Sequence, residues 1–216
     1  MRYRRANVAG GIYFFTVNLA DRQSTLLVDH VDHLRAAVRL VKIRHPFDIL
    51  AWVTLPDHLH SIWRLPPDDA DFPQRWALIK AQFSRSIPKG ETIGPSRHRK
   101  GERGIWQRRY WEHLIRDDDD LQRHVDYVHI NPVKHGHVTR ASDWPYSSIH
   151  RYIGRGELTK DWACGAEATL VAGERECDTR AGLSAMASFA VNVGMRFAYP
   201  NLHGAGTMAR RRSFLA

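Results

Sequence analysis

The sequence predicts a domain in which strands and helices are mixed, because two different periods alternate along it. Residues 11–19 alternate two sets of mainly apolar side chains, which is typical of a strand covered on both faces. Residues 31–44 instead repeat apolar side chains every three or four positions, which is the period of a helix. Pro46 ends that helix, because proline lacks the backbone N–H that a helix interior uses.

Two further strands and a second long helix follow. Residues 47–55 and 58–65 are β-rich runs, and the Pro56-Asp57 pair between them predicts a turn. Residues 72–87 return to helical spacing, with large apolar side chains every three or four positions. The order so far is strand, helix, strand, strand, helix.

The next segment changes in composition. Residues 88–104 are rich in glycine, proline, serine and basic side chains, so we predict a mobile loop that is a candidate for binding substrate. A mixed aromatic and basic stretch then predicts a further strand over residues 110–115. Four acids, residues 117–120, are typical of the start of a helix, where carboxylates interact favourably with the helix dipole.

That last helix is predicted to reach about Ile130, with Asn131-Pro132 at its end or in a distorted final turn. A short helical segment is expected over residues 144–153. Beyond this the periods fade, so we divide the chain into a domain of residues 1–163 and a loosely ordered tail of residues 164–216.

Composition excludes several classes of protein. The 216 residues are 43% hydrophobic, which suits one domain with a core plus an extension. No stretch approaches the roughly 18 to 20 apolar residues of a membrane span, and no signal peptide is predicted. Cys164 and Cys177 are expected to be free thiols of a cytoplasmic protein.

Charge points to a polyanionic partner. The chain has 32 Lys and Arg against 23 Asp and Glu, which gives a net charge of +9. Such a balance favours nucleic acid, because neutralised phosphates release counterions. Aromatic side chains beside the central arginines could stack on unpaired bases. The candidate DNA-binding residues are Arg2, Arg4, Arg5, Arg99, Lys100, Arg103, Arg108 and Arg109.

Two histidines, His58 and His60, flank one residue in a predicted strand. Side chains two apart in a strand point to the same face, so both imidazoles can bind one metal ion. A second pair, His135 and His137, follows the last helix and is more typical of a histidine-rich loop.

A polar stripe runs along the last predicted helix. It consists of Asp120, His124, Tyr127 and Asn131, which recur at about one helical turn. If this stripe faces the sheet, Tyr127 stands next to a metal bound by the two histidines, with the Asn131 oxygen as a third ligand. Imidazole suits transition metals, and a carbonyl oxygen keeps Mg²⁺ or Mn²⁺ plausible.

This arrangement suits phosphodiester chemistry. A metal bound to a phosphate oxygen makes phosphorus more electrophilic, and in-line attack by Tyr127 gives a phosphotyrosyl intermediate. Because the intermediate conserves the bond energy, it allows transfer as well as hydrolysis. His124, one turn before the tyrosine, is a candidate helper of that attack.

Several motifs together resemble the REP-associated tyrosine transposases, relatives of the IS200/IS605 transposases in the single-tyrosine HUH superfamily. The likeness covers about residues 1–163, and the chain departs from it in a long insert at residues 89–102 and in the tail. The motifs are Tyr3-Arg-Arg, Gly10-Gly, Phe14-Phe-Thr-Val-Asn-Leu19, Pro56-Asp-His-Leu-His60, Trp106-Gln-x-x-Tyr-Trp-Glu-His113, His124-Val-Asp-Tyr127-Val-His-Ile-Asn131-Pro-Val-Lys-His-Gly136 and Ser142-Asp-Trp-Pro-Tyr-Ser147.

The resemblance implies a ferredoxin-like α+β fold, an antiparallel sheet with helices packed on it, as in HUH endonucleases. His58 and His60 would be the metal ligands, Asn131 would stand at the third ligand position, and Tyr127 would form a 5′-phosphotyrosine. The cofactor would be Mg²⁺ or Mn²⁺. The partner would be single-stranded DNA with REP-like hairpins, bound by a monomer or homodimer at the nucleoid.

Three alternatives remain open from the sequence. The chain could be a non-catalytic protein that binds DNA hairpins, a metallohydrolase that acts on a small phosphoester with water as nucleophile, or an RNA-processing enzyme.

Overall fold

The computed structural model describes residues 7–91, 93 and 95–164. Three of the predicted DNA-binding residues, Arg2, Arg4 and Arg5, lie outside this part of the chain. The predicted tail also lies outside it, except for Cys164, which is an exposed free thiol. The boundary between domain and tail therefore stays a prediction. In the described part, none of the helices is both long enough and apolar enough to cross a membrane.

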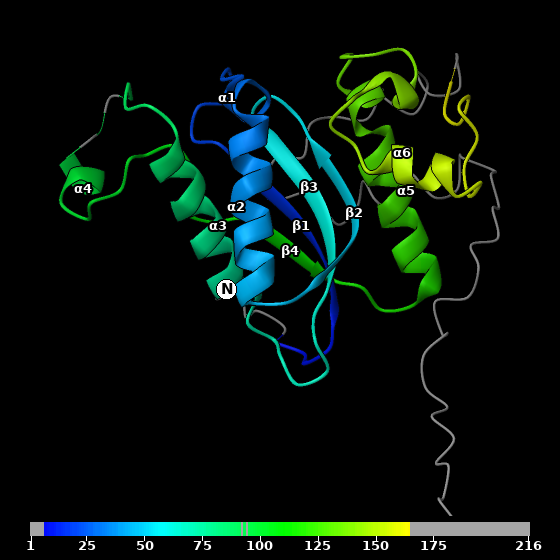
Figure 1. Cartoon of the computed structure of the whole chain (residues 1–216), viewed down its shortest axis with the longest axis horizontal. Helices are drawn as coiled ribbons and strands as arrows, with labels where there is room; N and C mark the ends of the chain where they lie inside the picture. The colour runs from blue at the N-terminus through cyan, green and yellow to red at the C-terminus, as the bar shows by residue number, and fades with distance from the viewer. Residues whose placement is uncertain (1–6, 92, 94, 165–216) are drawn as a thin grey trace, which may run out of the picture.

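Four strands form one antiparallel sheet in the order β2-β3-β1-β4 (Figure 1). The strands are β1 (Ile12–Asn18), β2 (Asp48–Thr54), β3 (His58–Arg64) and β4 (Trp111–Leu114). Strand β1 pairs with β3 on one side and with β4 on the other. With the long helix α2 (Val31–Arg44) in the connection from β1 to β2 and α3 (Phe72–Ser86) in that from β3 to β4, this is the ferredoxin-like α+β arrangement that was predicted.

Helices cover both faces of the sheet (Figure 1). Helices α2 (Val31–Arg44) and α3 (Phe72–Ser86) pack on each other and cover one face. Helices α5 (Asp118–Lys134) and α6 (Ile149–Gly154) cover the other. The shorter elements are α1 (Leu26–Asp29), α4 (Pro95–His98) and η1 (Ala141–Asp143).

The alternation of side chains along β1 and β3 divides the interior into two apolar cores. In β1, Phe15 packs toward α2 and α3, whereas its neighbour Phe14 packs toward α5. In β3, Trp63 belongs to the first core and Ile62 to the second. Because His58 and His60 share the parity of Ile62, both histidines face α5.

Helix α5 extends one turn beyond its predicted end. Pro132 lies inside it, and the helix reaches Lys134. Gly136 then adopts the left-handed region, with φ of +69°, and its N–H donates to the Val133 carbonyl at 2.9 Å. The N–H of His137 donates to the Pro132 carbonyl at the same distance. These two bonds form a Schellman motif, in which glycine is favoured because it lacks a Cβ.

We expect a glycine-to-alanine change at position 136 to lower the free energy of unfolding by about 1 kcal/mol, because an L-residue is strained in that conformation. A Cβ there would meet nothing within 4 Å, so no clash adds to the strain. Urea denaturation measures the change. Gly154, which also has free space around a Cβ but no positive φ, offers the matched alanine control; an equal loss at both positions would contradict the strain argument.

Burial of His129 makes the stability of the domain depend on pH. Burial lowers the pKa of this imidazole to about 3 from an ordinary value of 6.5, and the nearby charge of Arg151 acts in the same direction. Below pH 6.5 the unfolded chain therefore binds a proton that the folded chain does not bind. The free energy of unfolding should fall as pH decreases toward 3, by about 2 kcal/mol at pH 5 from this residue alone.

Urea denaturation at pH 7 and pH 5 tests this effect. His129→Gln should flatten the pH dependence, whereas His33→Gln, on the exposed side of α2, should leave it unchanged. Equal pH dependence in the wild type and His129→Gln would show that this residue does not carry the effect.

Candidate metal and tyrosine site

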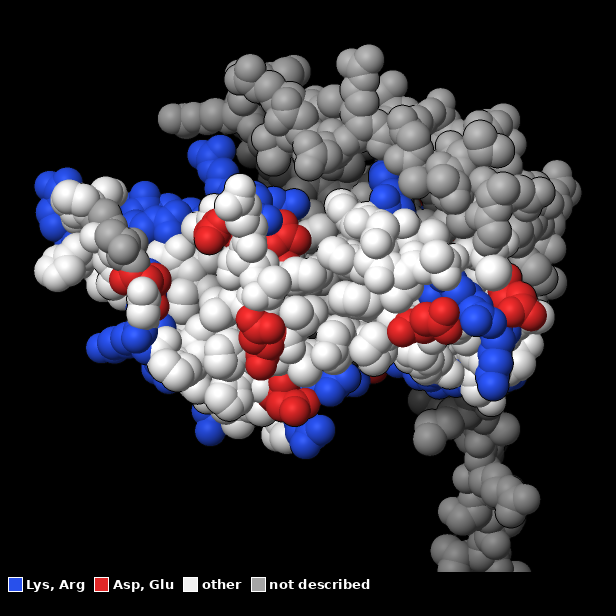
Figure 2. Space-filling view, turned by 90° about the horizontal axis from the view of Figure 1, so that it is seen from above, with Lys and Arg blue, Asp and Glu red and all other residues white. Residues whose placement is uncertain are grey.

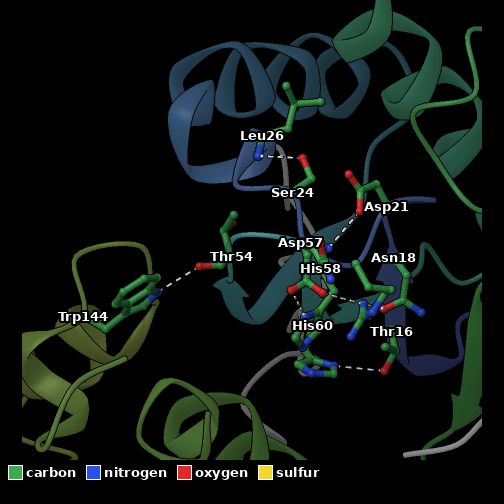
Figure 3. A network of polar contacts seen from close by, with 12 residues as sticks. Thr16, Asn18, Asp21, Ser24, Leu26, Thr54, Asp57, His58, His60 and Trp144 are labelled. Atoms are coloured by element: carbon green, nitrogen blue, oxygen red, sulfur yellow. Dashed lines mark hydrogen bonds and ion pairs between the residues drawn. The ribbon is translucent and has the colours of Figure 1, made fainter. Parts of the chain in front are cut away.

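Strand pairing brings the two histidines of β3 to one place. The register sets His60 opposite Thr16 and His58 opposite Asn18. The two imidazole ring centroids lie 5.0 Å apart with an interplanar angle of 84°. Both side chains are buried, and Figure 3 shows them side by side at the end of the strand.

A carboxylate orients the first histidine. His58 Nδ1 lies 2.7 Å from Asp57 Oδ1, so an N–H at Nδ1 leaves Nε2 with its lone pair. Burial acts to raise the pKa of Asp57, but the hydrogen bond with His58 and the charge of Arg22 outweigh it, so the pKa lies below its ordinary value. Arg22 reaches Asp57 Oδ2 at 3.1 Å and also donates to Asn18 Oδ1. A metal-binding histidine is commonly held by such a carboxylate.

A hydroxyl orients the second histidine. His60 Nδ1 lies 2.9 Å from Thr16 Oγ1, as the dashed line in Figure 3 shows. Burial lowers the pKa of His60 well below its ordinary value, and His58, His135 and Lys134 act in the same direction, while the side chain of Asn131 opposes them. The ring is therefore the neutral imidazole that binds metals.

Two buried atoms at this place lack a hydrogen-bond partner among the described residues, His60 Nε2 and Asn131 Oδ1. The Nδ2 group of Asn131 donates to the Tyr127 carbonyl at 3.4 Å. The amide nitrogen therefore already has a partner, and the amide oxygen is the atom that can bind a metal. Buried polar atoms without a partner cost free energy. A divalent cation bound by His58, His60 and Asn131 would satisfy both atoms, so this donor set fits the predicted metal.

Helix α5 places Tyr127 against the same histidine. Its ring centroid lies 5.2 Å from that of His60, with the planes at 72°. The ring also contacts Phe14 edge-on at 5.9 Å, and the Lys134 ammonium lies 5.3 Å from its centroid. A strand residue and a helix residue far apart in sequence thus share one site.

His124 lies in a different cluster from the one we predicted. Its Nδ1 is 2.7 Å from the Asp120 carbonyl oxygen, and its ring stacks on His113 at 4.7 Å. Burial lowers the pKa of His124 to about 4. Phe14 contacts both His124 and Tyr127, at 4.9 Å and 5.9 Å. The described contacts therefore join His124 to Asp120 and His113.

That second cluster could itself hold a metal ion. The ligand atoms of His113, Asp120 and His124 all lie within 4.8 Å of one another. Asp120 Oδ2 is 2.8 Å from His113 Nε2, and Asp120 Oδ1 is 3.2 Å from His124 Nδ1. The carboxylate already bonds both imidazoles, whereas His124 Nε2 is a buried atom that, like His60 Nε2 and Asn131 Oδ1, lacks a partner among the described residues.

The predicted DNA-binding residues divide into two groups. Arg99, Lys100, Arg108 and Arg109 are exposed, although Arg108 also pairs with Glu102 at 2.9 Å. Figure 2 shows basic side chains gathered at the end of the molecule that carries α4. Arg103 instead bonds Glu91 and the carbonyls of Ser84, Ile87 and Pro88. It ties Pro88 and Glu91 to the end of α3.

Sequence reasoning did not place four residues beside the site that lie there: Thr16, Asp57, Lys134 and His135. Asp57 is next to His58 in the sequence, and this position beside a candidate ligand could have indicated that it belongs to the site. The His135 ring lies 5.0 Å from that of His58, so the second His-x-His pair lies next to the first. No local pattern reveals that approach.

No sequence model of a protein family matches this chain. An Escherichia coli K12 protein named REP-associated tyrosine transposase is 49% identical over 173 residues, which cover 80% of this chain and 96% of that protein. The chain belongs to the REP-associated tyrosine transposases. A Haemophilus influenzae relative of this transposase family is 45% identical over 161 residues, covering 74% of this chain and 92% of its own length.

One solved structure supports the same assignment. It is described as a REP-associated tyrosine transposase bound to a REP hairpin, and it is 46% identical in sequence, with a TM-score of 0.67. The match covers 82% of this chain and 99% of that chain. The predicted family and α+β fold are thereby confirmed, and the chain is an enzyme of the transposase type that binds DNA.

Proposed function

We propose that this transposase cleaves and rejoins single-stranded DNA beside REP-like hairpins, through a covalent bond between Tyr127 and a 5′ phosphate. The observation that carries the proposal is the approach of the Tyr127 and His60 rings, 5.2 Å between centroids, beside two buried atoms suited to a metal. His58, His60 and Asn131 would hold Mg²⁺ or Mn²⁺.

The metal, when bound, would withdraw charge from the scissile phosphate and stabilise the charge that develops there. The phenolic oxygen of Tyr127 loses its proton to water and bonds to phosphorus, and the bond to the 3′ oxygen breaks. That oxygen takes up a proton from water and leaves as a free 3′-hydroxyl. Attack by a 3′-hydroxyl on the phosphotyrosine reverses these changes and joins the strand.

The surrounding residues have positioning roles in this proposal. Asp57 and Thr16 fix the two imidazole rings through their Nδ1 atoms. Lys134 holds a positive charge over the Tyr127 ring, where it favours the negative charge that forms on the phenolic oxygen. We assign no step to His124, the predicted helper, whose contacts are with Asp120, His113 and Phe14.

The hairpin partner is supported by two observations. The solved relative is described as bound to a REP hairpin, and Arg99, Lys100, Arg108 and Arg109 expose positive charge on this chain. Phosphate contacts of this kind weaken as salt increases. The proposal includes binding of the hairpin by a monomer or by a homodimer.

A single experiment separates this function from its rivals. Purified full-length chain is incubated with a labelled hairpin oligonucleotide that has single-stranded flanks, with and without Mn²⁺, and resolved on a denaturing gel. We expect a metal-dependent covalent adduct with DNA and none with an RNA hairpin of the same sequence. Metal-dependent cleavage without an adduct would indicate water as nucleophile, and binding without cleavage would indicate a hairpin-binding protein.

The orientation of His58 provides a further prediction. Asp57→Asn removes the charged acceptor of the His58 N–H, so we expect the Mn²⁺ concentration needed for half-maximal cleavage to rise about 10- to 100-fold. Asp48→Asn is the matched control, because Asp48 is exposed at the far end of β2. An unchanged metal requirement in Asp57→Asn would remove this carboxylate from the site.

A further inference from the structure

A continuous series of aromatic rings leads away from the metal and tyrosine site across the surface. From His58 the next ring is His135, with 5.0 Å between centroids. His135 stacks near His137 at 6.2 Å, and His137 stacks on Trp144 at 5.2 Å. Trp144 meets Tyr146 edge-on at 5.5 Å. We call His135, His137, Trp144 and Tyr146 the ring track.

Two segments of the chain are fixed to build this track. The Schellman turn at Gly136 ends α5 and carries the two histidines on either side of the glycine. The segment before α6 is tied to the end of β2, because the Trp144 indole N–H donates to the Thr54 carbonyl at 2.9 Å (Figure 3). The Thr54 N–H donates to the Tyr146 carbonyl at 2.9 Å. The rings are thus preorganised next to His58.

The track is open to solvent and basic at both ends. His135 and His137 are exposed, and Trp144 and Tyr146 are half-buried. Lys134 precedes the first ring. At the last ring, the Arg35 guanidinium lies 5.8 Å from the Tyr146 ring centroid and also pairs with Asp32 at 3.0 Å. Rings that served only the interior would be covered, whereas these leave π-surface and positive charge available together. Unpaired nucleotides have both complementary features, a base that stacks and a negative phosphate.

We propose that the ring track binds the unpaired nucleotides that continue from the scissile phosphate, by stacking their bases. This inference rests on the proposed function, because it takes the end of the track at His58 as the position of the cleaved bond. It adds a binding surface for single-stranded DNA that is separate from the exposed arginines around α4. Stacking tolerates any base, so the track would hold the strand without reading its sequence.

The test compares two DNA ligands with the full-length chain carrying Tyr127→Phe, so that no cleavage interferes. One ligand is a hairpin with an unpaired extension on the cleavage side, containing 2-aminopurine, and the other is the same hairpin without the extension. We expect the extension to tighten binding about tenfold and to quench 2-aminopurine fluorescence on binding. His137→Ala combined with Trp144→Leu should remove both effects and leave binding of the plain hairpin unchanged.

Two further variants distinguish stacking from folding. Trp144→Phe keeps a ring but loses the bond to Thr54, so it should retain most of the quenching. His33→Ala, whose ring stacks on His30 outside the track, is the matched histidine control and should change nothing. A thermal unfolding curve for each variant identifies any that fails to fold.

Three outcomes would overturn the proposal. In the first, the double variant fully retains the quenching and the tighter binding. In the second, the double variant loses equal affinity for both DNA ligands. In the third, the extension gives no gain in affinity for the Tyr127→Phe chain. Failure of the proposed function is distinguishable, because it would show as absence of the covalent adduct in the wild type, with or without a ring track.

Discussion

Tyr127→Phe should abolish the covalent protein–DNA adduct while hairpin binding survives. The substitution removes only the phenolic oxygen, which is the atom that would bond to phosphorus. The ring remains, so its contacts with His60 and Phe14 should persist. Denaturing gels with a labelled hairpin measure the adduct, and a filter-binding titration measures affinity, which we expect to stay within about threefold because no phosphate contact is lost.

Tyr152 offers the matched control for this change. Both tyrosines are 8% exposed, but Tyr152 belongs to α6 and donates its hydroxyl to the Leu50 carbonyl at 2.9 Å. Tyr152→Phe should lower the free energy of unfolding by about 1 kcal/mol and leave the adduct intact. A full yield of adduct from Tyr127→Phe would show that another residue is the nucleophile.

His60→Ala should lower the rate of metal-dependent cleavage at least a hundredfold, with little change in hairpin affinity. A bound metal contributes several kcal/mol of charge stabilisation to a phosphoryl transition state, and each 1.4 kcal/mol corresponds to a factor of ten in rate. His60 supplies a buried nitrogen that has no partner among the described residues. Cleavage rates over a Mn²⁺ titration, together with calorimetric Mn²⁺ binding, measure the loss.

His113→Ala tests the competing cluster. If His58, His60 and Asn131 hold the functional metal, His113→Ala should keep the Mn²⁺ dependence of cleavage. Removing His113 leaves Asp120 with His124 and the Arg116 N–H, so some loss of stability is expected without loss of metal response. The reverse pattern, with cleavage lost in His113→Ala and kept in His60→Ala, would assign the metal to the second cluster.

Local sequence predicted the elements well because each depends on its own period. The bounds of α2 agree with the predicted residues 31–44, and β3 begins at His58 as predicted. The expected end of α5 at about Ile130 was wrong by one turn, and of the two positions predicted for Pro132 the structure has the one inside the final turn. Pro132 suggested a stop, but a proline in the final turn loses only one hydrogen bond, and Gly136 supplies the actual end.

Side chains that pair with other groups of the same chain were harder to predict. Arg103 looks like its basic neighbours in sequence, yet its guanidinium is used by Glu91 and by backbone carbonyls. The 88–104 segment also contains the short helix α4. His124 shares a helical face with Tyr127, but Asp120 and His113 surround it. Spacing along a helix predicts which side chains share a face, but it does not identify the residues that this face contacts.

The sequence by itself determined the four strands, the long helices, the family and the types of group available: two same-face histidines, a tyrosine and an amide on one helix. Only the tertiary structure decided which of them meet. Strand order sets Thr16 against His60, and the packing of α5 on the sheet brings Tyr127 to that ring and His135 to His58. The reason is physical. A period follows from the covalent geometry of nearby residues, whereas contacts between distant segments depend on how whole elements pack.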